Sequence, residues 1–386
     1  MGEPLRFTKI SLKNWKNFRE VNAALPIRVF LVGPNASGKS NFLDALRFLR
    51  DVVAVGGGLQ SAVHQRGGVS AIRCLAARSQ TEVHIGVHIG NTTHPNAWGY
   101  ELSFVQLNSQ EKRPVITRER VLRDGEVILD RPDSDDAEDR ERLTQTFLEQ
   151  VNANRRFRNI AEFLGTINYL HIVPQLVREP DRSVGRKNDP YGGDFLEQIA
   201  RTSEKFYTAQ LKKIRDTLRI AVPQLKELKL WRDARGTPHL RGKYEHWRPQ
   251  GAWQTEEQFS DGTLRLMGLL WATSIDKGPL LLEEPELSLN AGVVRYIPQM
   301  FARIQGRSGR QIVVSTHSTD LLLDTGIGLD EVFILTPSRE GTVVSPAADS
   351  WEIKELVDGG LSVGEAVLPH TRPERAEQLY LFGDKE

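Results

Sequence analysis

The chain has 386 residues, of which 51 are basic, 50 are acidic and one is a cysteine. This length allows two or three domains, or one large domain with insertions. The net charge of +1 excludes a strongly basic, histone-like protein but permits a local basic patch. The single cysteine, Cys74, excludes an intramolecular disulfide and is typical of a reducing compartment.

No targeting or membrane segment is evident. Residues 1–19 mix apolar residues with lysines and arginines and lack the continuous apolar run of a signal peptide. The most apolar stretch, Leu264–Ile275, contains Arg265 and is shorter than the roughly 20 residues that span a bilayer. We therefore expect a cytoplasmic protein with no membrane partner.

The first region, residues 1–130, is predicted to be rich in β-strands around one helix. Leu5 and Phe7 lie before an expected polar turn, and Ile10 and Leu12 lie after it. Residues 27–32 form an apolar run typical of a buried strand, and apolar residues at helical spacing follow from Phe42. Further strands are expected at 81–89, 100–106, 115–122 and 126–129.

Residues 131–250 predict a compact helical insertion with a hairpin. Apolar residues recur at helical spacing over 143–164 and over 195–218, with a loop at 178–193 between them. The hairpin pairs 227–232 with 239–244. No heptad pattern continues beyond about three repeats, so a long coiled coil is not expected.

Residues 251–345 return to α/β alternation, and residues 346–386 form a C-terminal tail. A helix is expected at 264–273, and short buried strands at 280–282, 312–314 and 332–335. This alternation is typical of parallel strands with crossover helices. The tail carries apolar residues that either pack on this region or bind a partner, namely Trp351, Leu356, Tyr380, Leu381 and Phe382.

Residues Gly33–Ser40 match the pattern G-x-x-x-x-G-K-[ST], between a strand and a helix. Glycines let backbone N–H groups wrap a phosphate, the lysine neutralises phosphate oxygens and the serine ligates Mg²⁺. The helix N-terminus adds its positive dipole end. We expect the nucleotide to be bound by Asn35, Ser37, Gly38, Lys39, Ser40 and Asn41.

The strand 280–282 ends in Glu283 and Glu284. Ligands bind at the carboxyl edge of parallel sheets, so these carboxylates belong beside the phosphate loop. One carboxylate can hold Mg²⁺, and the next can orient or deprotonate the attacking water. We interpret the segment as a Walker B strand.

Two further motifs lie at the ends of expected helices or strands. Ser260 and Gly262 directly precede the 264–273 helix, where they make either an anion site or a plain N-cap. His317 follows the strand 311–314 and is expected at the same sheet edge as the two carboxylates.

In this order, the motifs resemble the ATP-binding-cassette (ABC) ATPase head of the RecF/Rad50/SMC and OLD-like branch. The best match is the stand-alone ATPases of the AAA15, or AAA_21, type. The resemblance rests on the opening segment 10–18 and on 33–40, 259–265, 280–289 and 315–317. It implies an α/β P-loop NTPase fold, an ABC-type head with a β-rich N-terminal lobe and a helical insertion.

The resemblance also implies a role for each motif. Ser260 and Gly262 are similar to the signature motif, which caps the γ-phosphate of ATP bound to a second protomer. Glu284 matches the general base and Glu283 the Mg²⁺ position, where many such ATPases carry aspartate. Residues 286–290 match the D-loop, and His317 the switch histidine. Gln175 is our choice for the Q-loop glutamine, a ligand of Mg²⁺ and of nucleotide, with Gln65 as second choice.

The resemblance implies a homodimer that sandwiches ATP and Mg²⁺, possibly within a higher oligomer. A Toprim nuclease domain would not fit in the roughly 50 residues after Leu335, so a separate effector protein is expected, in phage defence. A RecF-like repair ATPase and a scaffold with negligible hydrolysis stay open, while the opening motif disfavours a transporter subunit. DNA is a possible partner through basic residues of the 195–218 helix, although a solvated helix face explains them more simply.

Overall fold

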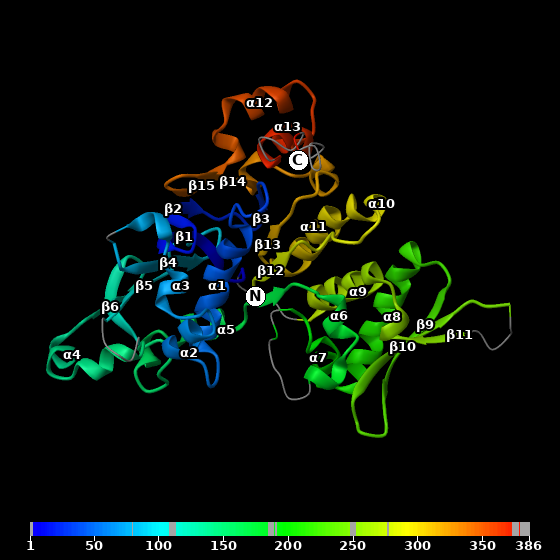
Figure 1. Cartoon of the computed structure of the whole chain (residues 1–386), viewed down its shortest axis with the longest axis horizontal. Helices are drawn as coiled ribbons and strands as arrows, with labels where there is room; N and C mark the ends of the chain where they lie inside the picture. Colours follow the sequence, from blue (N-terminus) through cyan, green and yellow to red (C-terminus); the bar gives the residue numbers. More distant parts are fainter. Residues whose placement is uncertain are drawn as a thin grey trace, which may run out of the picture.

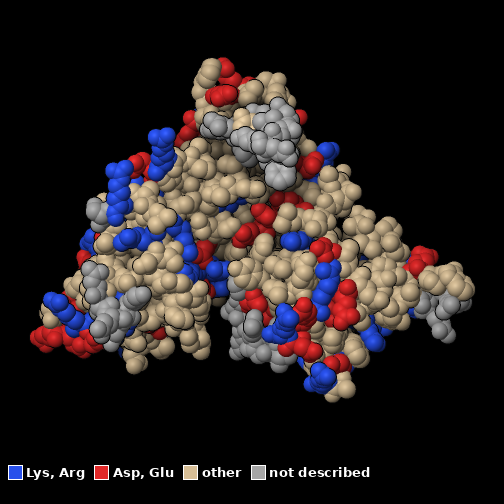
Figure 2. All heavy atoms as spheres, viewed as in Figure 1, with Lys and Arg blue, Asp and Glu red and all other residues tan. Residues whose placement is uncertain are grey.

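The computed structural model describes residues 3–78, 80–107, 113–183, 191–247, 252–275 and 278–372, together with 189 and 378. Figure 1 shows a first lobe that holds α1 and the N-terminal strands, and a second lobe that holds α7–α9 and β9–β11. A notch separates the two lobes on the face shown in Figure 2, and acidic and basic side chains are intermixed over that face.

The central element is a six-stranded sheet in the order β15-β14-β3-β13-β12-β8, in which only β15 is antiparallel to its neighbour. Its strands come from distant parts of the chain: β3 (Arg28–Val32), β8 (Asn168–Leu170), β12 (Leu280–Glu283), β13 (Ile312–Ser315), β14 (Val332–Ser338) and β15 (Gly341–Pro346). The strands at 280–282, 312–314 and 332–335 were predicted, because strands covered on both faces are continuously apolar. The expected α/β fold is confirmed.

A second sheet is antiparallel, in the order β2-β1-β4-β5-β6-β7. Its strands are β1 (Arg6–Trp15), β2 (Phe18–Ala24), β4 (Val83–Gly90), β5 (Trp98–Gln106), β6 (Pro114–Arg123) and β7 (Glu126–Arg131). The predicted turn between Phe7 and Ile10 is wrong. β1 is continuous there, and a register shift between Phe7 and Lys9 accounts for the broken alternation that suggested a turn.

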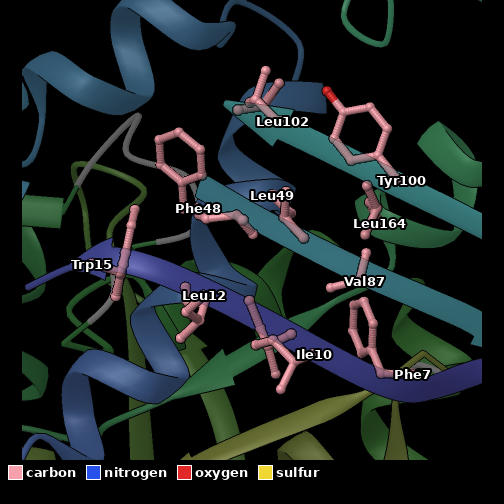
Figure 3. Packing of buried hydrophobic residues seen from close by; sticks show 14 of the residues in the cluster. Phe7, Ile10, Leu12, Trp15, Phe48, Leu49, Val87, Tyr100, Leu102 and Leu164 are labelled. Atoms are coloured by element: carbon pink, nitrogen blue, oxygen red, sulfur yellow. The ribbon is translucent and has the colours of Figure 1, made fainter. Parts of the chain in front are cut away.

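Helix α1 (Lys39–Val53) packs between the two sheets, at the position predicted after the glycine-rich loop. Phe48 and Leu49 of α1 meet β1 residues such as Ile10 and Leu12 in one buried cluster, part of which is seen in Figure 3. Alternate residues of β3 divide between two cores: Val29 and Leu31 face this cluster. Phe30 and Val32 face a second cluster on the other side of the parallel sheet. The central sheet therefore holds both cores together.

The second lobe covers the other face of the parallel sheet. It contains α6 (Pro174–Val177), α7 (Phe195–Ala200), α8 (Glu204–Ala221), α9 (Asp261–Ser274), α10 (Ala291–Val294) and α11 (Ile297–Ser308). The predicted single helix over 195–218 is divided into α7 and α8. The extended backbone of Ser203 at the N-terminus of α8 causes the break.

The predicted hairpin is present and has a third strand. β9 (Leu225–Arg232) and β10 (Pro238–Tyr244) are antiparallel, and β11 (Ala252–Thr255) extends the sheet. Of the expected loop at 178–193, residues 184–188 and 190 lie outside the described residues.

The start of the expected insertion packs with the first lobe. After α4 (Ser134–Glu138) and α5 (Arg158–Gly165), the chain enters β8 of the central sheet. Leu148 and Leu164 belong to the first core, as do parts of α2 (Leu59–His64) and α3 (Val69–Ile72). The chain thus enters the second lobe, with α6 and α7, after β8.

The C-terminal segment forms α12 (Trp351–Asp358) and α13 (Val363–Thr371) above the sheet in Figure 1. Ile353 and Val367 are fully buried in the second core, so this part of the tail packs on the head. Trp351 is 72% exposed, while Tyr380, Leu381 and Phe382 lie outside the described residues. Among the described residues, no helix combines the length and apolarity needed to cross a membrane.

A buried ion network joins β6 and β7 to the following segment. The Arg131 guanidinium donates to Glu119 and Asp136 at 2.8 Å each, and all three side chains are fully buried. Glu119 also accepts from the backbone N–H groups of Phe147 and Leu148.

Replacement of Arg131 by methionine should lower the free energy of unfolding by about 3–5 kcal/mol, because it leaves the buried Glu119 carboxylate without its cation and Asp136 with Arg142 alone. Urea unfolding followed by tryptophan fluorescence measures this loss. The matched control is Arg120→Met, which breaks a partly exposed pair with Asp130 (2.6 Å) and should cost less than about 1 kcal/mol. Equal losses in the two variants would contradict the stabilising role of Arg131.

Candidate functional site

Four loops meet at the carboxyl edge of the central sheet. Strands β3, β13, β12 and β8 are parallel neighbours, so the segments after them leave the sheet on the same side. These segments carry the glycine-rich loop, His317, the Glu283–Glu284 pair and Gln175.

The loop 33–40 is held in its bent form by glycines and by Asn17. Gly38 has φ 98°, and a Cβ placed there would lie 2.1 Å from the Asn17 side chain. The Asn17 amide donates to the Ser37 carbonyl at 2.8 Å and to Thr342 Oγ1 at 2.6 Å. A side chain at Gly38 would therefore displace Asn17. The opening motif 10–18 did not reveal this contact.

Lys39 is 5% exposed and uses its three donors within the site. Its Nζ donates to the carbonyls of Gly33 (2.9 Å) and Pro34 (3.0 Å) and lies 3.4 Å from His317 Nδ1. Burial lowers the pKa of Lys39 to about 8, against the opposing effect of the Glu284 and Glu283 carboxylates.

His317 links Lys39 to Glu284. An ammonium group only donates, so His317 Nδ1 accepts from Lys39 and Nε2 carries the proton. That Nε2 lies 2.9 Å from Glu284 Oε1, and this hydrogen bond is the main cause that lowers the pKa of Glu284. Glu284 has φ 43°, a left-handed conformation that is uncommon for glutamate. The predicted base and the predicted switch histidine are thus in direct contact.

Ser40 and Glu283 form a pair of oxygen ligands. Ser40 Oγ donates to Glu283 Oε1 at 2.5 Å, and the Tyr169 hydroxyl donates to Glu283 Oε2. Hydroxyl and carboxylate oxygens suit Mg²⁺, which takes its other ligands from phosphate and water. The motif search missed Tyr169, although it lies on the strand that precedes Gln175.

Glu286 joins the D-loop to the loop of His317. Its Oε1 accepts from Thr316 Oγ1 at 2.5 Å and from the His317 backbone N–H at 3.2 Å. Burial raises the pKa of this carboxyl, whose Oε2 has no hydrogen-bond partner among the described residues. Sequence spacing alone gave Glu286 only a position in the D-loop.

The signature segment lies at the N-terminus of α9. Ser260 is the N-cap, and its Oγ accepts from the Thr263 N–H at 3.2 Å. A Cβ at Gly262 would lie 2.4 Å from the Ser288 carbonyl, so the D-loop approaches α9 closely. In the described part of the chain, no hydrogen bond joins Ser260 or Gly262 to the loop 33–40.

The remaining predicted residues lie in different environments. Asn35 is exposed, whereas Ser37 is fully buried, and its Oγ has no hydrogen-bond partner in the part of the chain that the structure describes. The Asn41 amide donates to Asn17 at 2.8 Å, which gives it a supporting contact in the loop. Gln175 is exposed on α6 after β8, while Gln65 lies at the end of α2 and bonds Ser61. Of the two glutamines, only Gln175 follows a strand of the parallel sheet.

Comparison with known families gives a match over residues 28–324 to AAA_21, described as "AAA domain, putative AbiEii toxin, Type IV TA system". The chain belongs to this family. The match spans every motif of the site from the glycine-rich loop to His317. The protein is therefore a P-loop NTPase of the ABC-ATPase head type, as the motifs predicted.

Known structures with a similar fold include Smc heads. The Smc head bound to the C-winged helix domain of ScpA is 12% identical and has a TM-score of 0.56, with 88% of this chain and 96% of that chain covered. The head domain with an extended coiled coil, bound to the C-terminal domain of ScpA derived from Pyrococcus furiosus, gives a TM-score of 0.50 at 12% identity, with coverages of 92% and 100%. Both show the fold.

Among curated proteins, a segment of 47 residues is 47% identical to endonuclease GajA of Bacillus cereus (strain VD045). This segment is 12% of the chain and spans 8% of GajA.

The affinity of the site for ATP should fall above pH 8, by up to about tenfold per pH unit, because phosphate binding needs the Lys39 ammonium. The Lys39→Arg variant should bind ATP with little pH dependence in this range, since arginine stays charged. Fluorescent-nucleotide titrations between about pH 7 and pH 9.5, on both sides of the pKa, measure both. A flat wild-type profile would contradict the lowered pKa.

The lowered pKa of Lys39 also affects the free energy of unfolding of the protein without nucleotide. The folded-state pKa of about 8 lies below the ordinary 10.5, so the unfolded chain binds more protons between these values. The unfolding free energy contributed by Lys39 therefore rises with pH across this window, and Lys39→Met should remove that rise.

Proposed function

We propose that the protein is an ATP-dependent, dimerising ABC-type ATPase that hydrolyses ATP with Mg²⁺ to switch a separate effector protein, in phage defence. The observation that carries the proposal is the contact of Glu284 with His317 beside Lys39. A base, a polar sensor and a phosphate-binding cation thereby meet at one sheet edge.

Each group has a defined task in hydrolysis. Glu284, whose lowered pKa keeps it ionised, orients the attacking water and accepts its proton. Lys39 would exchange its bonds to the Gly33 and Pro34 carbonyls for bonds to phosphate oxygens. Ser40 and Glu283 would hold Mg²⁺, which supplies charge neutralisation at the phosphates. Gln175, exposed on α6 after β8, would join this set.

The placement of the signature segment supports a dimer. Ser260 and Gly262 lie against Thr263 and the D-loop, on α9 of the second lobe. A second protomer, turned by a two-fold axis, can present these residues to the nucleotide held by the first. ATP would then join two protomers, and hydrolysis would release them.

A separate effector accords with the comparisons. The family description refers to a toxin–antitoxin system, and GajA is an endonuclease. An Smc head of the same fold binds the C-winged helix domain of ScpA. We propose that the dimer likewise engages a partner protein in the cytoplasm, and that closure and opening of the dimer control that partner.

In the Glu284→Gln variant, ATP hydrolysis should fall at least about a hundredfold, because the amide cannot accept the proton of the attacking water. ATP should still bind, and the ATP-bound dimer should persist in size-exclusion chromatography. Glu352→Gln, at an exposed position of α12, is the matched control and should hydrolyse ATP like the wild type. Unchanged hydrolysis in Glu284→Gln would rule out the general-base role.

A mixing experiment tests the shared site. Glu284→Gln and Ser260→Arg should each be inactive, because one lacks the base and the other blocks the partner's γ-phosphate. Mixed before ATP is added, they should recover part of the activity, since each mixed dimer has one intact site. The readout is phosphate release at several mixing ratios. No recovery at any ratio, with both variants folded and dimerising, would contradict a site built from two protomers.

A further inference from the structure

The sheet β9–β10–β11 lies at the outer end of the second lobe, away from α1 and the nucleotide site (Figure 1). Its inner face packs on α7 and α8 through Leu225, Leu228 and Leu240, all of which are buried. Side chains of a strand alternate between two faces, so the residues between these leucines form an outer face.

That outer face combines two tryptophans with three cations. We call it the Trp–cation face, and it consists of Lys229 and Trp231 on β9, Arg241 and Lys243 on β10, and Trp253 on β11. Trp231 is 40% exposed and Trp253 is 44% exposed. The Arg241 guanidinium lies 4.1 Å from the centre of the Trp231 ring. Lys229 Nζ and Lys243 Nζ lie 5.1 Å and 5.9 Å from the Trp253 ring.

The pairing on this face has an electrostatic cost. Lys229 is directly opposite Arg241 in the ladder, and like charges at opposed positions destabilise a sheet. Glu227 pairs with both lysines, at 2.8 Å and 3.5 Å, which leaves three cations and one carboxylate. A bound anion would relieve this excess of positive charge.

We propose that the Trp–cation face binds single-stranded nucleic acid. Unpaired bases stack on Trp231 and Trp253, and the phosphates pair with Lys229, Arg241 and Lys243. Aromatic rings interleaved with cations are the combination that binds single strands without sequence preference. This activity goes beyond the proposed ATPase function and does not depend on it.

The positions of the two tryptophans suit a single nucleic-acid strand that crosses the sheet diagonally. Trp231 is opposite His239 and Trp253 is opposite Lys243, on the two sides of β10. The backbone positions of the two tryptophans are therefore displaced by ~13 Å along β10 and ~10 Å across it. Arg241 lies between them in the register, where it can contact the phosphate backbone of the bound nucleic-acid strand.

The composition of the face favours a single strand over a duplex or a protein. Base faces are stacked and hidden in a duplex, so exposed rings would find no partner there. Protein interfaces are enriched in tryptophan and arginine but depleted in lysine, whereas Trp253 here has two lysines against it.

Fluorescence anisotropy of the full-length protein with fluorescein-labelled oligothymidine and oligouridine tests the proposal, at low salt and without nucleotide. Wild type should bind at least one of the two, and binding to either supports the proposal and identifies the strand. Trp231→Ala and Trp253→Ala should each weaken binding by about fivefold or more, as loss of base stacking does. The double variant Lys229→Ala and Lys243→Ala should also lower the salt dependence.

Further variants separate stacking from folding. Trp231→Phe and Trp253→Phe should retain most of the binding, while the leucine variants, which keep apolar bulk but no ring, should lose it. Trp351→Ala on α12 and the Lys212→Ala, Lys213→Ala pair on α8 are controls outside the face and should bind like the wild type. All variants are assayed for ATP hydrolysis, so that loss of the ATPase and loss of strand binding are told apart.

The proposal would be overturned by no binding of either oligonucleotide by wild type at low salt, by leucine variants that bind like wild type, or by duplex DNA bound as tightly as single strands. Loss of binding in the α8 variants with none in the face variants would move the interaction to α8, and would also overturn it.

Discussion

The site depends on the parallel pairing of β3, β13, β12 and β8. In this ladder Leu31 is opposite Ser315, and Ser315 is opposite Glu283, so the ends of three strands are level. A shift of one residue would turn each strand over and move Val29 and Leu31 out of the first core. Burial on both faces therefore fixes the register, and the register brings the loop, the carboxylates and His317 together.

The same strand pairing concentrates carboxylates in the site. Glu283, Glu284 and Glu286 gather around one lysine, and all of these groups are at least partly removed from water. Each carboxylate has different hydrogen-bond donors. Glu283 accepts from Ser40 and Tyr169, Glu284 from His317, and Glu286 from Thr316. The His317 hydrogen bond lowers the pKa of Glu284, whereas burial raises the pKa of Glu286. Similar residues thus acquire different chemical roles through their contacts.

Features set by local pattern were predictable, and features set by distant contacts were not. The buried strands and the loop before α1 show in the sequence because continuous apolar runs and glycine spacing are local signals. The bulge near Phe7, the break at Ser203 and the joining of β8 to the central sheet depend on pairing or capping that spacing does not encode. Likewise the motifs supplied Glu283 and Glu284, but Tyr169 and Asn17 contact the site only after folding.

The charge of the Trp–cation face was likewise not predictable from the sequence. A net charge of +1 and the mixed surface of Figure 2 give no sign of an anion-binding surface. On β9 and β10 the outer residues are interrupted in sequence by Leu228, Leu230, Leu240 and the buried Gly242. β11, which contributes Trp253, was not predicted as a strand at all, because its four residues are too few for a clear alternation. Three short strands with unremarkable composition therefore build a local surface whose charge and aromatic content neither the whole chain nor any one strand displays.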